Sequence, residues 1–469
     1  CNIIHKVNSY TSDDKIANMN RPELLSPAGS LKHMRYAYAY GADAVYAGQP
    51  RYSLRVRNNS FDFDTLKQGI TEAHDNNKKF FVASNIIPHN AKIKTYMKDI
   101  EPVIALKPDA LIMADPGLIM MVKEKFPEQV IHLSVQANAI NYATVKFWKN
   151  AGISRIILSR ELSLDEVQEI RQECPDIELE VFVHGALCIA YSGRCLLSGY
   201  FNHRDPNQGS CTNSCRWKYD VKEAQETIEG DIKAVEIKAP IDQVVLLEEE
   251  GRPGEQMPAY EDEHGTYIMN SKDLRAIEHV HTLTKMGIDS LKIEGRTKSH
   301  YYAARTAQVY RQAIDDAVAG REFNPEAFGV LENLANRGYT DGFYRRHQPE
   351  ELQTYFDNYS RSHKQQVVGE ILDYKDGKAL IEAKNKFSVG DSIEVVLPDG
   401  CFNTEVESMV TEYNEVLDVA KGSGYRVWIP MPEIKPELGF IARNFDEKIT
   451  IKNKNIKKDP DQKIRRPSW

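Results

Sequence analysis

Four of the seven cysteines lie close enough together in the chain to share one ligand-binding site. Their spacing is Cys-x6-Cys-x15-Cys-x3-Cys, whereas structural zinc sites favour tight Cys-x2-Cys pairs. Loosely spaced thiolates from loops suit an iron–sulfur cluster better, and the intervening glycines let the backbone bend around it. We therefore favour a cluster over zinc, and both over buried structural thiols. The four residues are Cys188, Cys195, Cys211 and Cys215.

The segments that must position this site alternate between short aliphatic runs and helical patterns, from Glu23 to about residue 320. Eight such runs, each followed by a connection long enough for a crossover, predict a TIM-type (β/α)8 barrel. An open doubly wound sheet is the alternative. The expected strands are 23–25, 44–46, 80–84, 110–113, 131–135, 155–158, 179–183 and 290–293, with helices at 30–40, 64–76, 93–106, 142–150 and 164–172.

Polar residues follow most of these strands. Active sites of TIM-type barrels lie at the C-terminal ends of the strands, so these residues are candidates for catalysis and binding. His184, Glu294 and Arg296 are the candidate catalytic residues. A purely structural role is the alternative: Glu294 and Arg296 would pair only with each other, and Asn85 or Asn138 would cap the following helix.

The connection between the seventh and eighth strands, about residues 185–289, contains all four clustered cysteines. It is too long for a simple loop, so we expect it to form structure of its own. Its second half predicts two paired strands, Gln243–Leu247 and Thr266–Met269, around the turn at residues 251–254. The seventh strand leads almost directly into Cys188, which predicts that the cysteine site lies at the mouth of the barrel.

Further segments are expected on both sides of a barrel domain at residues 19–345. Before it, residues 1–18 are interpreted as an N-terminal extension. After a polar linker at 346–364, short strands separated by glycine and aspartate turns predict a small all-β barrel at 365–446. The basic segment 447–469 fits an RNA contact and a solvated tail equally well.

Composition excludes some classes of protein. The formal net charge of −8 argues against indiscriminate coating of nucleic acid, so any RNA must be bound through local basic patches. No apolar run approaches the roughly 18 residues that a membrane span needs, and the start lacks a signal pattern. The sequence therefore predicts a cytoplasmic protein with no membrane partner.

Several motifs resemble one family. Residues 180–188 (EVFVHGALC) and 191–198 (YSGRCLLS) are similar to the signature of the collagenase-like peptidase family, as are 23–29 (ELLSPAG), 252–254 (RPG), 270–274 (NSKDL) and 292–296 (KIEGR). The resemblance extends from about Glu23 through the C-terminal barrel. The stretch at 199–209 (GYFNHRDPNQG) resembles the branch of prephenate-dependent tRNA hydroxylases.

This resemblance implies an oxygen-independent enzyme that forms 5-hydroxyuridine at the wobble position of tRNA, with prephenate as hydroxyl donor and a 4Fe-4S cluster as cofactor. It implies the tRNA anticodon loop as partner and leaves room for an electron-transfer partner. Relatives on the same scaffold hydroxylate a ribosomal RNA cytidine or act in ubiquinone synthesis. Some relatives place a cysteine where this chain has Arg275, a departure that leaves Cys215 as the implied fourth ligand.

The implied substrates assign roles to cationic residues. A dicarboxylate donor needs cations, and a guanidinium matches a carboxylate in shape, which makes Arg160, Arg194 and Arg296 candidate donor-binding residues. Near the second strand, Arg51, Arg55 and Arg57, together with Tyr52, would contact phosphate and stack on bases. Ordinary surface arginines are an equal alternative for these three. Peptide hydrolysis is the second hypothesis, although no His-Glu-x-x-His or Gly-x-Ser-x-Gly motif is present. A non-catalytic RNA-binding factor is the third.

Overall fold

The structure is a computed structural model, and it describes residues 20–49, 51–54, 60–188, 190–198, 203–212, 272–345 and 365–445. Between 213 and 271 it describes the backbone of five short strands. The chain divides into two compact units, residues 1–361 and 362–469. None of the described helices is long and apolar enough to cross a membrane.

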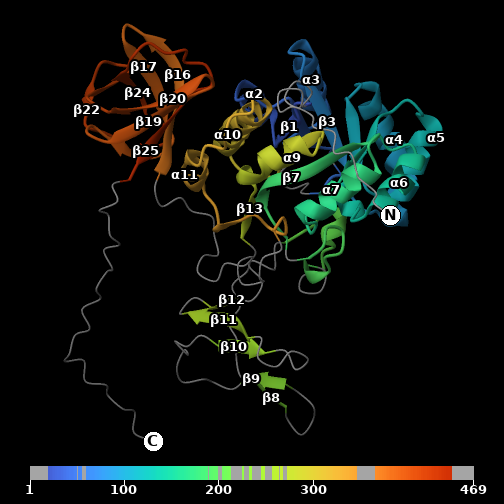
Figure 1. The fold of residues 1–469 in the computed structure, drawn as a ribbon. Coiled ribbons are helices and arrows are strands. Elements are labelled where there is room, and N and C mark those ends of the chain that lie inside the picture. The colour runs from blue at the N-terminus through green and yellow to red at the C-terminus, as the bar shows by residue number, and fades with distance from the viewer. Residues whose placement is uncertain are drawn as a thin grey trace, which may run out of the picture. The chain divides into compact units, whose positions relative to one another are not determined.

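Eight parallel strands close into a barrel in the first unit (Figure 1). The ring is closed by the last strand, in which Ser290 pairs with Glu23 on one side and with Glu180 on the other. The TIM-type barrel is therefore confirmed, and the open doubly wound sheet is wrong. The barrel strands are β1 (Glu23–Pro27), β2 (Ala44–Gly48), β3 (Lys79–Ser84), β4 (Ala110–Met113), β5 (Ile131–Leu133), β6 (Arg155–Ile157), β7 (Glu178–Ala186) and β14 (Ser290–Ile293).

Helices follow the strands, and short polar residues fix where most of them begin. The side chains of Ser30, Asp115, Asn141 and Ser299 each accept a hydrogen bond from the first turn of the helix that they precede. These caps satisfy backbone N–H groups of the first turn and so fix where the four helices begin. The helices are α2 (Leu31–Ala39), α3 (Phe63–Asp75), α4 (Asn90–Ala105), α5 (Pro116–Lys125), α6 (Tyr142–Asn150), α7 (Leu164–Glu173), α9 (Val280–Lys285), α10 (His300–Val318) and α11 (Glu326–Glu332).

Strand β7 extends beyond the rim of the barrel and receives an extra partner. Its last three residues pair antiparallel with β13 (Asp273–Arg275), and β15 (Tyr339–Thr340) adds parallel to β13. The sequence did not indicate either short strand. Together they cover the side of β7 that faces away from β6 at this end of the barrel.

The insertion between β7 and β14 contains two small antiparallel sheets among its described residues. One pairs β8 (Ala224–Glu226) with β9 (Ile232–Ala234). In the other, β10 (Val245–Glu248) pairs with β11 (Gln256–Asp262), and β11 pairs with β12 (Gly265–Tyr267). The expected hairpin was therefore wrong in its pairing, because β11 lies between the two strands that were predicted to pair.

The second unit is an antiparallel β domain, which confirms the all-β prediction. Its eight-stranded sheet has the order β20-β19-β25-β16-β17-β24-β21-β22. Aliphatic side chains such as Val368, Ile381 and Val395 form its core. The strands of this unit are β16 (Gln365–Lys375), β17 (Lys378–Ala383), β18 (Phe387–Ser388), β19 (Ser392–Leu397), β20 (Gly400–Glu405), β21 (Met409–Thr411), β22 (Val416–Leu417), β23 (Val419–Ala420), β24 (Arg426–Pro430) and β25 (Phe440–Asn444).

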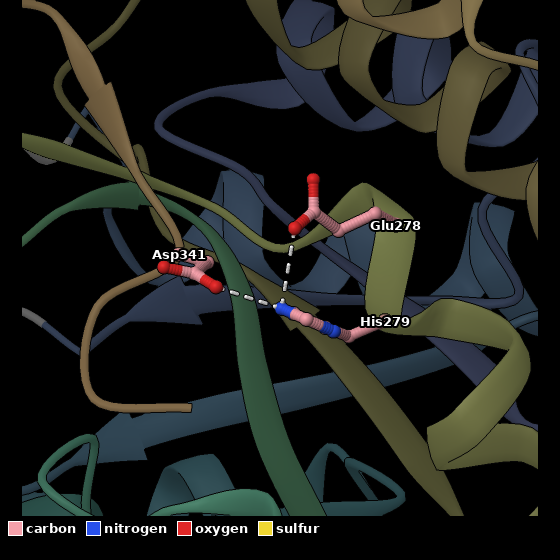
Figure 2. A group of neighbouring side chains, drawn as sticks. All are labelled: Glu278, His279 and Asp341. Carbon is pink, nitrogen blue, oxygen red and sulfur yellow. Dashed lines mark hydrogen bonds and ion pairs between the residues drawn. The ribbon is translucent and has the colours of Figure 1, made fainter. Parts of the chain in front are cut away.

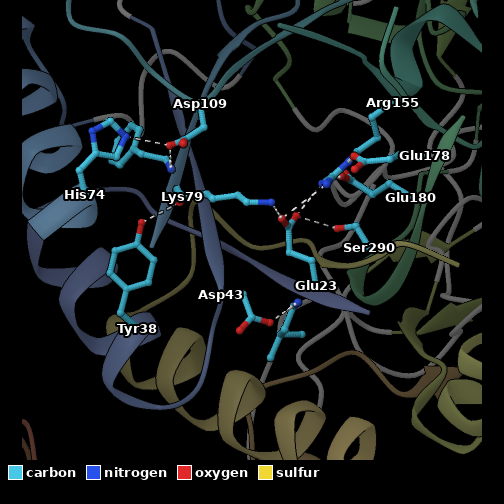
Figure 3. A network of polar contacts seen from close by, with 12 residues as sticks. Glu23, Tyr38, Asp43, His74, Lys79, Asp109, Arg155, Glu178, Glu180 and Ser290 are labelled. Atoms are coloured by element: carbon cyan, nitrogen blue, oxygen red, sulfur yellow. Dashed lines mark hydrogen bonds and ion pairs between the residues drawn. The ribbon is translucent and has the colours of Figure 1, made fainter. Parts of the chain in front are cut away.

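The barrel interior contains ion pairs as well as aliphatic side chains. Arg155, whose side chain is 3% exposed, donates to Glu23 at 2.5 Å and to Glu180 at 3.2 Å. Figure 3 shows Glu23 in the middle of this network, where it also accepts from Lys79 and Ser290. Burial alone would raise the pKa of Glu23, but the charges and hydrogen bonds of Arg155 and Lys79 hold it below its ordinary value. The carboxylate therefore stays ionised inside the barrel.

Candidate active site

A cavity of about 150 Å³ lies at the C-terminal ends of the barrel strands. Side chains from β2, β3, β4, β6, β7 and β14 line it, together with the segments that follow β5 and β7. Its polar lining combines thiols, cations and one carboxylate. Of the residues singled out from the sequence, it includes Arg160, Cys188, Cys195, Cys211, Glu294 and Arg296.

Glu294 follows β14 and is held from two sides of the cavity. Its carboxylate accepts from the Arg160 guanidinium at 3.3 Å and from the Tyr46 hydroxyl at 3.5 Å. Its backbone N–H donates to the carbonyl of His184, and a Cβ on Gly185 would lie 2.3 Å from the Glu294 carbonyl oxygen. Only glycine fits this approach, since Gly185 also has a φ of +106°. The close contact of β7 with β14 therefore fixes Glu294 at the cavity wall.

The arginines of the cavity rest on aromatic rings. The Arg160 guanidinium lies 3.8 Å from the centroid of the Phe182 ring. Arg296 lies 5.6 Å from the centroid of Tyr46 and donates to the Leu54 carbonyl at 2.7 Å. Contact with a ring orients a guanidinium and leaves its charge available to an anion. Two of the three predicted donor-binding arginines are therefore in the cavity.

His184 lies behind the cavity wall and is not among the residues that line the cavity. Its ring is enclosed by three tyrosine rings, those of Tyr302, Tyr310 and Tyr339, and Nδ1 lies 3.3 Å from the Tyr310 hydroxyl. Burial lowers its pKa to about 3, so the imidazole is neutral at physiological pH. A direct catalytic role for His184 stays a prediction, and its contacts here are those of a packing residue.

Three of the four clustered cysteines converge on the cavity. Cys188, Cys195 and Cys211 form no disulfide bond with one another and line the same cavity. Burial raises the pKa of the Cys195 thiol, and its proximity to Cys188 and Cys211 raises it further. Three soft thiol donors facing one space fit the ligand set of an iron–sulfur cluster. Cys215 lies outside the described residues.

Two close contacts anchor the loops that carry these thiols. Gly193 has a φ of +73°, and a Cβ there would lie 2.3 Å from the backbone oxygen of Gln136. Asn207 donates to the carbonyl of Cys195 at 3.3 Å, while its own carbonyl accepts from Ile87. The loop at 190–198 is therefore held against the barrel strands rather than by its own contacts alone.

The structure describes only part of the predicted phosphate-binding rim, and the prediction that Tyr52 stacks on a base is wrong. Tyr52 is fully buried, and its hydroxyl donates to Asp99 at 2.7 Å, so its ring cannot stack on a base. Arg51 is exposed, pairs with Asp99 and lies over Tyr52. Arg194 is also exposed and does not line the cavity. Arg55 and Arg57 lie outside the described residues.

Asn85 and Asn138 do not cap the helices that follow them, which corrects the structural alternative. Asn85 lines the cavity, accepts from the Leu54 N–H and donates to Ser134, whereas Asn138 donates to Ser159. Both amides therefore link segments that follow different barrel strands. They help to hold the rim of the barrel in one shape.

A second group of ionisable side chains lies apart from the cavity (Figure 2). His279 Nε2 is 2.9 Å from Asp341 and 3.5 Å from Glu278. These atoms are close enough together to bind a metal ion. However, Arg345 forms ion pairs with both carboxylates and supplies the cation that they need. The group therefore fastens the segment after β15 to the barrel.

Lys292 and Tyr191 are among the cavity residues that were not singled out as site residues from the sequence. Lys292 lies on β14 and reaches the cavity from inside the barrel, and Tyr191 lies at the mouth, where its side chain is 51% exposed. The available signal for Lys292 was a single charged residue in an otherwise uncharged strand. For Tyr191 it was an aromatic residue between two of the clustered cysteines.

Comparisons with known proteins agree on one family. The model of peptidase family U32 matches residues 29–354, and that of the peptidase family U32 C-terminal domain matches 363–443. The tRNA hydroxylation protein P of Escherichia coli is 59% identical over 92% of this chain and 99% of its own length. The tRNA hydroxylation protein P of Haemophilus influenzae is 59% identical over 90% of this chain and 96% of its own length. A collagenase of Porphyromonas gingivalis is 28% identical over 89% and 96%.

Proposed function

The chain belongs to peptidase family U32, and from that premise we propose that it is an RNA-modifying enzyme that hydroxylates tRNA. Two relatives named for tRNA hydroxylation match almost its whole length. The observation that carries the proposal is the cavity itself, where three thiols share a wall with arginines and one carboxylate. The finer proposal is 5-hydroxyuridine at the wobble position, with prephenate as donor and no need for oxygen.

We propose that a 4Fe-4S cluster is the cofactor, held by Cys188, Cys195, Cys211 and, beyond the described residues, Cys215. Such a cluster supplies redox or Lewis-acid chemistry that protein side chains lack. The thiols support this because three of them line one cavity. Gly193 keeps the loop of Cys195 against Gln136, so the ligand set is positioned by the barrel.

The cationic lining supports an anionic donor. Arg160 and Arg296 each place a guanidinium in the cavity with an aromatic ring against it. Charge-assisted hydrogen bonds from such groups bind and orient a carboxylate. Glu294 accepts from Arg160, and it is the one carboxylate in the described lining that is placed to accept a proton from a reacting group.

The acceptor base would enter at the mouth, where Tyr191 lies. Its ring lines the cavity and half of it faces solvent, which is the arrangement that stacks an unpaired base. Anticodon-loop bases are already partly unstacked, so extruding one costs only about a few kcal/mol. Tyr191 thus replaces Tyr52 in the proposed stacking role, and exposed Arg194, three residues on, is available to a phosphate.

Nucleoside analysis of tRNA tests the function directly. We expect a deletion strain to lose 5-hydroxyuridine-derived nucleosides, the wild-type gene to restore them, and Cys188→Ser to fail. Cys401→Ser, at an exposed thiol of the β domain, is the matched control and should restore them fully. Purified protein with tRNA should then form the product under strict exclusion of oxygen, and only when prephenate is added.

The other hypotheses predict different results from the same strains. A hydroxylase of ribosomal RNA or of ubiquinone precursors would leave tRNA unchanged but alter those molecules. A peptidase or a non-catalytic RNA-binding factor would leave all three unchanged, because only a tRNA hydroxylase predicts the loss of a hydroxylated uridine. The basic segment 447–469 lies outside the described residues; its proposed contact with tRNA predicts weaker, less salt-dependent binding when Lys452, Lys454, Lys457 and Lys458 are neutralised.

A further inference from the structure

The floor of the cavity contains a lysine that the proposed function has not used. Lys292 lies on β14 with its side chain inside the barrel, and the residue is 3% exposed. Its ammonium group donates to Glu180 at 2.7 Å, and Glu180 is fully buried. The same ammonium lies 4.4 Å from the centroid of Tyr46 and 5.4 Å from that of Phe182. It is therefore a buried charge directly beneath the ligand space.

The ammonium group of Lys292 has more N–H donors than hydrogen-bond acceptors among the described residues. An ammonium has three N–H donors, and Glu180 is the one hydrogen-bond acceptor found for Lys292 among the described residues. Contact with two aromatic rings stabilises the positive charge but does not satisfy the donors. A buried donor without an acceptor is costly, and here the donors border a cavity. A ligand oxygen at the floor would remove that cost.

The balance of charges around the cavity floor also favours a bound anion. Glu180 does not serve Lys292 alone, because Arg155 approaches its other oxygen at 3.2 Å. One carboxylate thus lies between two cations. On the cavity side, three cations (Lys292, Arg160 and Arg296) face the single carboxylate of Glu294. This excess of positive charge in a low-dielectric site favours an anion.

We propose that Lys292 and Arg160 form a carboxylate-binding subsite at the floor of the cavity. Both charged groups lie within 5.4 Å of the centroid of the Phe182 ring, so they border one space. Apolar side chains of Ile112 and Ile157 also line that space. The subsite therefore takes a small molecule that carries a carboxylate on an apolar body. It rests on the proposed function only in identifying this molecule with the hydroxyl donor.

Two variants separate ligand binding from a merely structural role. In Lys292→Met alone, Glu180 loses a partner, so weaker binding could reflect a disturbed barrel. In the double variant Lys292→Met with Glu180→Gln, the pair is removed together, and Arg155 keeps Glu23 and Glu178 as partners. Lys79→Met is the matched control, since Lys79 pairs with Glu23 in the same ionic network but does not line the cavity.

The experiment measures binding rather than turnover. Full-length, iron-loaded protein is titrated calorimetrically under nitrogen with prephenate, with succinate and with uridine 5′-monophosphate. We expect prephenate to bind the double variant about 10- to 100-fold more weakly than it binds the wild type, because one or more charge-assisted hydrogen bonds are lost. Lys79→Met should bind prephenate as the wild type does. Unchanged iron content and unfolding temperature in the double variant verify its fold.

Each outcome decides the proposal. Prephenate binding by the double variant at wild-type strength would reduce Lys292 to a counter-ion of Glu180. Lysine-dependent binding of the nucleotide but of neither carboxylate would also overturn it. Lysine-dependent binding of succinate without prephenate binding would uphold the subsite and refute prephenate as the donor.

Discussion

Replacing Arg155 by methionine should destabilise the barrel far more than the loss of an exposed ion pair. Methionine keeps much of the length of the side chain and its contact with Phe81 but leaves buried Glu180 with one cation instead of two. Removing one partner of a buried pair costs about 3–5 kcal/mol. At about 1–2 °C per kcal/mol for a unit of this size, the unfolding temperature should fall by roughly 3–10 °C.

Calorimetric and urea unfolding measure this loss, and Arg35→Met is its control. Arg35 makes an ion pair with Glu72 at 2.6 Å, but both side chains are partly exposed, so its loss should cost at most about 1 kcal/mol. Similar losses in the two variants would refute the reasoning, because they would mean that the barrel charges are solvated.

The Arg155→Met variant should also shift the pH at which acid unfolds the protein. Arg155 and Lys79 outweigh the effect of burial and keep the pKa of Glu23 below its ordinary 4.5. The stability that Glu23 contributes is complete above 4.5 and is lost as pH falls through the lower folded value. Without Arg155 the folded value rises, so acid unfolding should begin at a higher pH. An unchanged acid transition would show that Arg155 does not set this pKa.

Three further predictions use matched variants. Burial lowers the pKa of His184 to about 3, so at this position only the unfolded state gains a proton as the pH falls below about 6.5. Between about pH 7 and 4.5 the unfolding free energy of the wild type should therefore fall by about 2.5 kcal/mol more than that of His184→Phe. An equal pH dependence of the urea-derived unfolding free energy in the two proteins would contradict this. Cys188→Ser should lower iron content and visible absorbance of anaerobic protein, whereas Cys401→Ser should not; iron retained by the first would remove Cys188 from the ligands. Gly193→Ala should lower cluster occupancy, whereas Gly287→Ala, with a similar φ of +76° but open space around it, should cost only about 1 kcal/mol of stability; equal occupancy would show that the Gln136 contact is unimportant.

The barrel was predictable because its strands carry a strong local signal. Each is a short aliphatic run ended by polar residues, and the strand at Ala110–Met113 was predicted with the bounds that the structure has. The short strand β13 gave no such signal, since Asp273–Arg275 contains two charged residues and pairs with β7, which is distant in sequence. Strand β11 pairs with its neighbours in sequence but also gave a weak signal, because Gln256–Asp262 contains a proline and ends in two charged residues.

Site residues could be predicted where the residue type alone indicates the chemistry, but not where their role depends on burial. Three cysteines with Arg160, Glu294 and Arg296 do line one cavity. Tyr52 resembled an exposed stacking residue, but the turn at Arg51, with a φ of +77°, places its ring inside the protein. Lys292 and Glu180 are ordinary charged residues in the sequence. Their pairing inside the barrel becomes visible only when β14 closes the ring against β7.

The cavity has two parts that differ in how they are held. Its floor is built by side chains of barrel strands, where Lys292 and Glu180 are locked by strand pairing and by the ion pairs of Arg155. Its mouth is built by loops, in which Tyr191 depends on contacts such as that of Gly193 with Gln136. Changes at the floor must therefore alter ligand binding and barrel stability together, unless both members of a pair are removed. Changes at the mouth should alter binding of the RNA while the unfolding free energy of the barrel stays constant, because no ladder hydrogen bond or buried charge is lost.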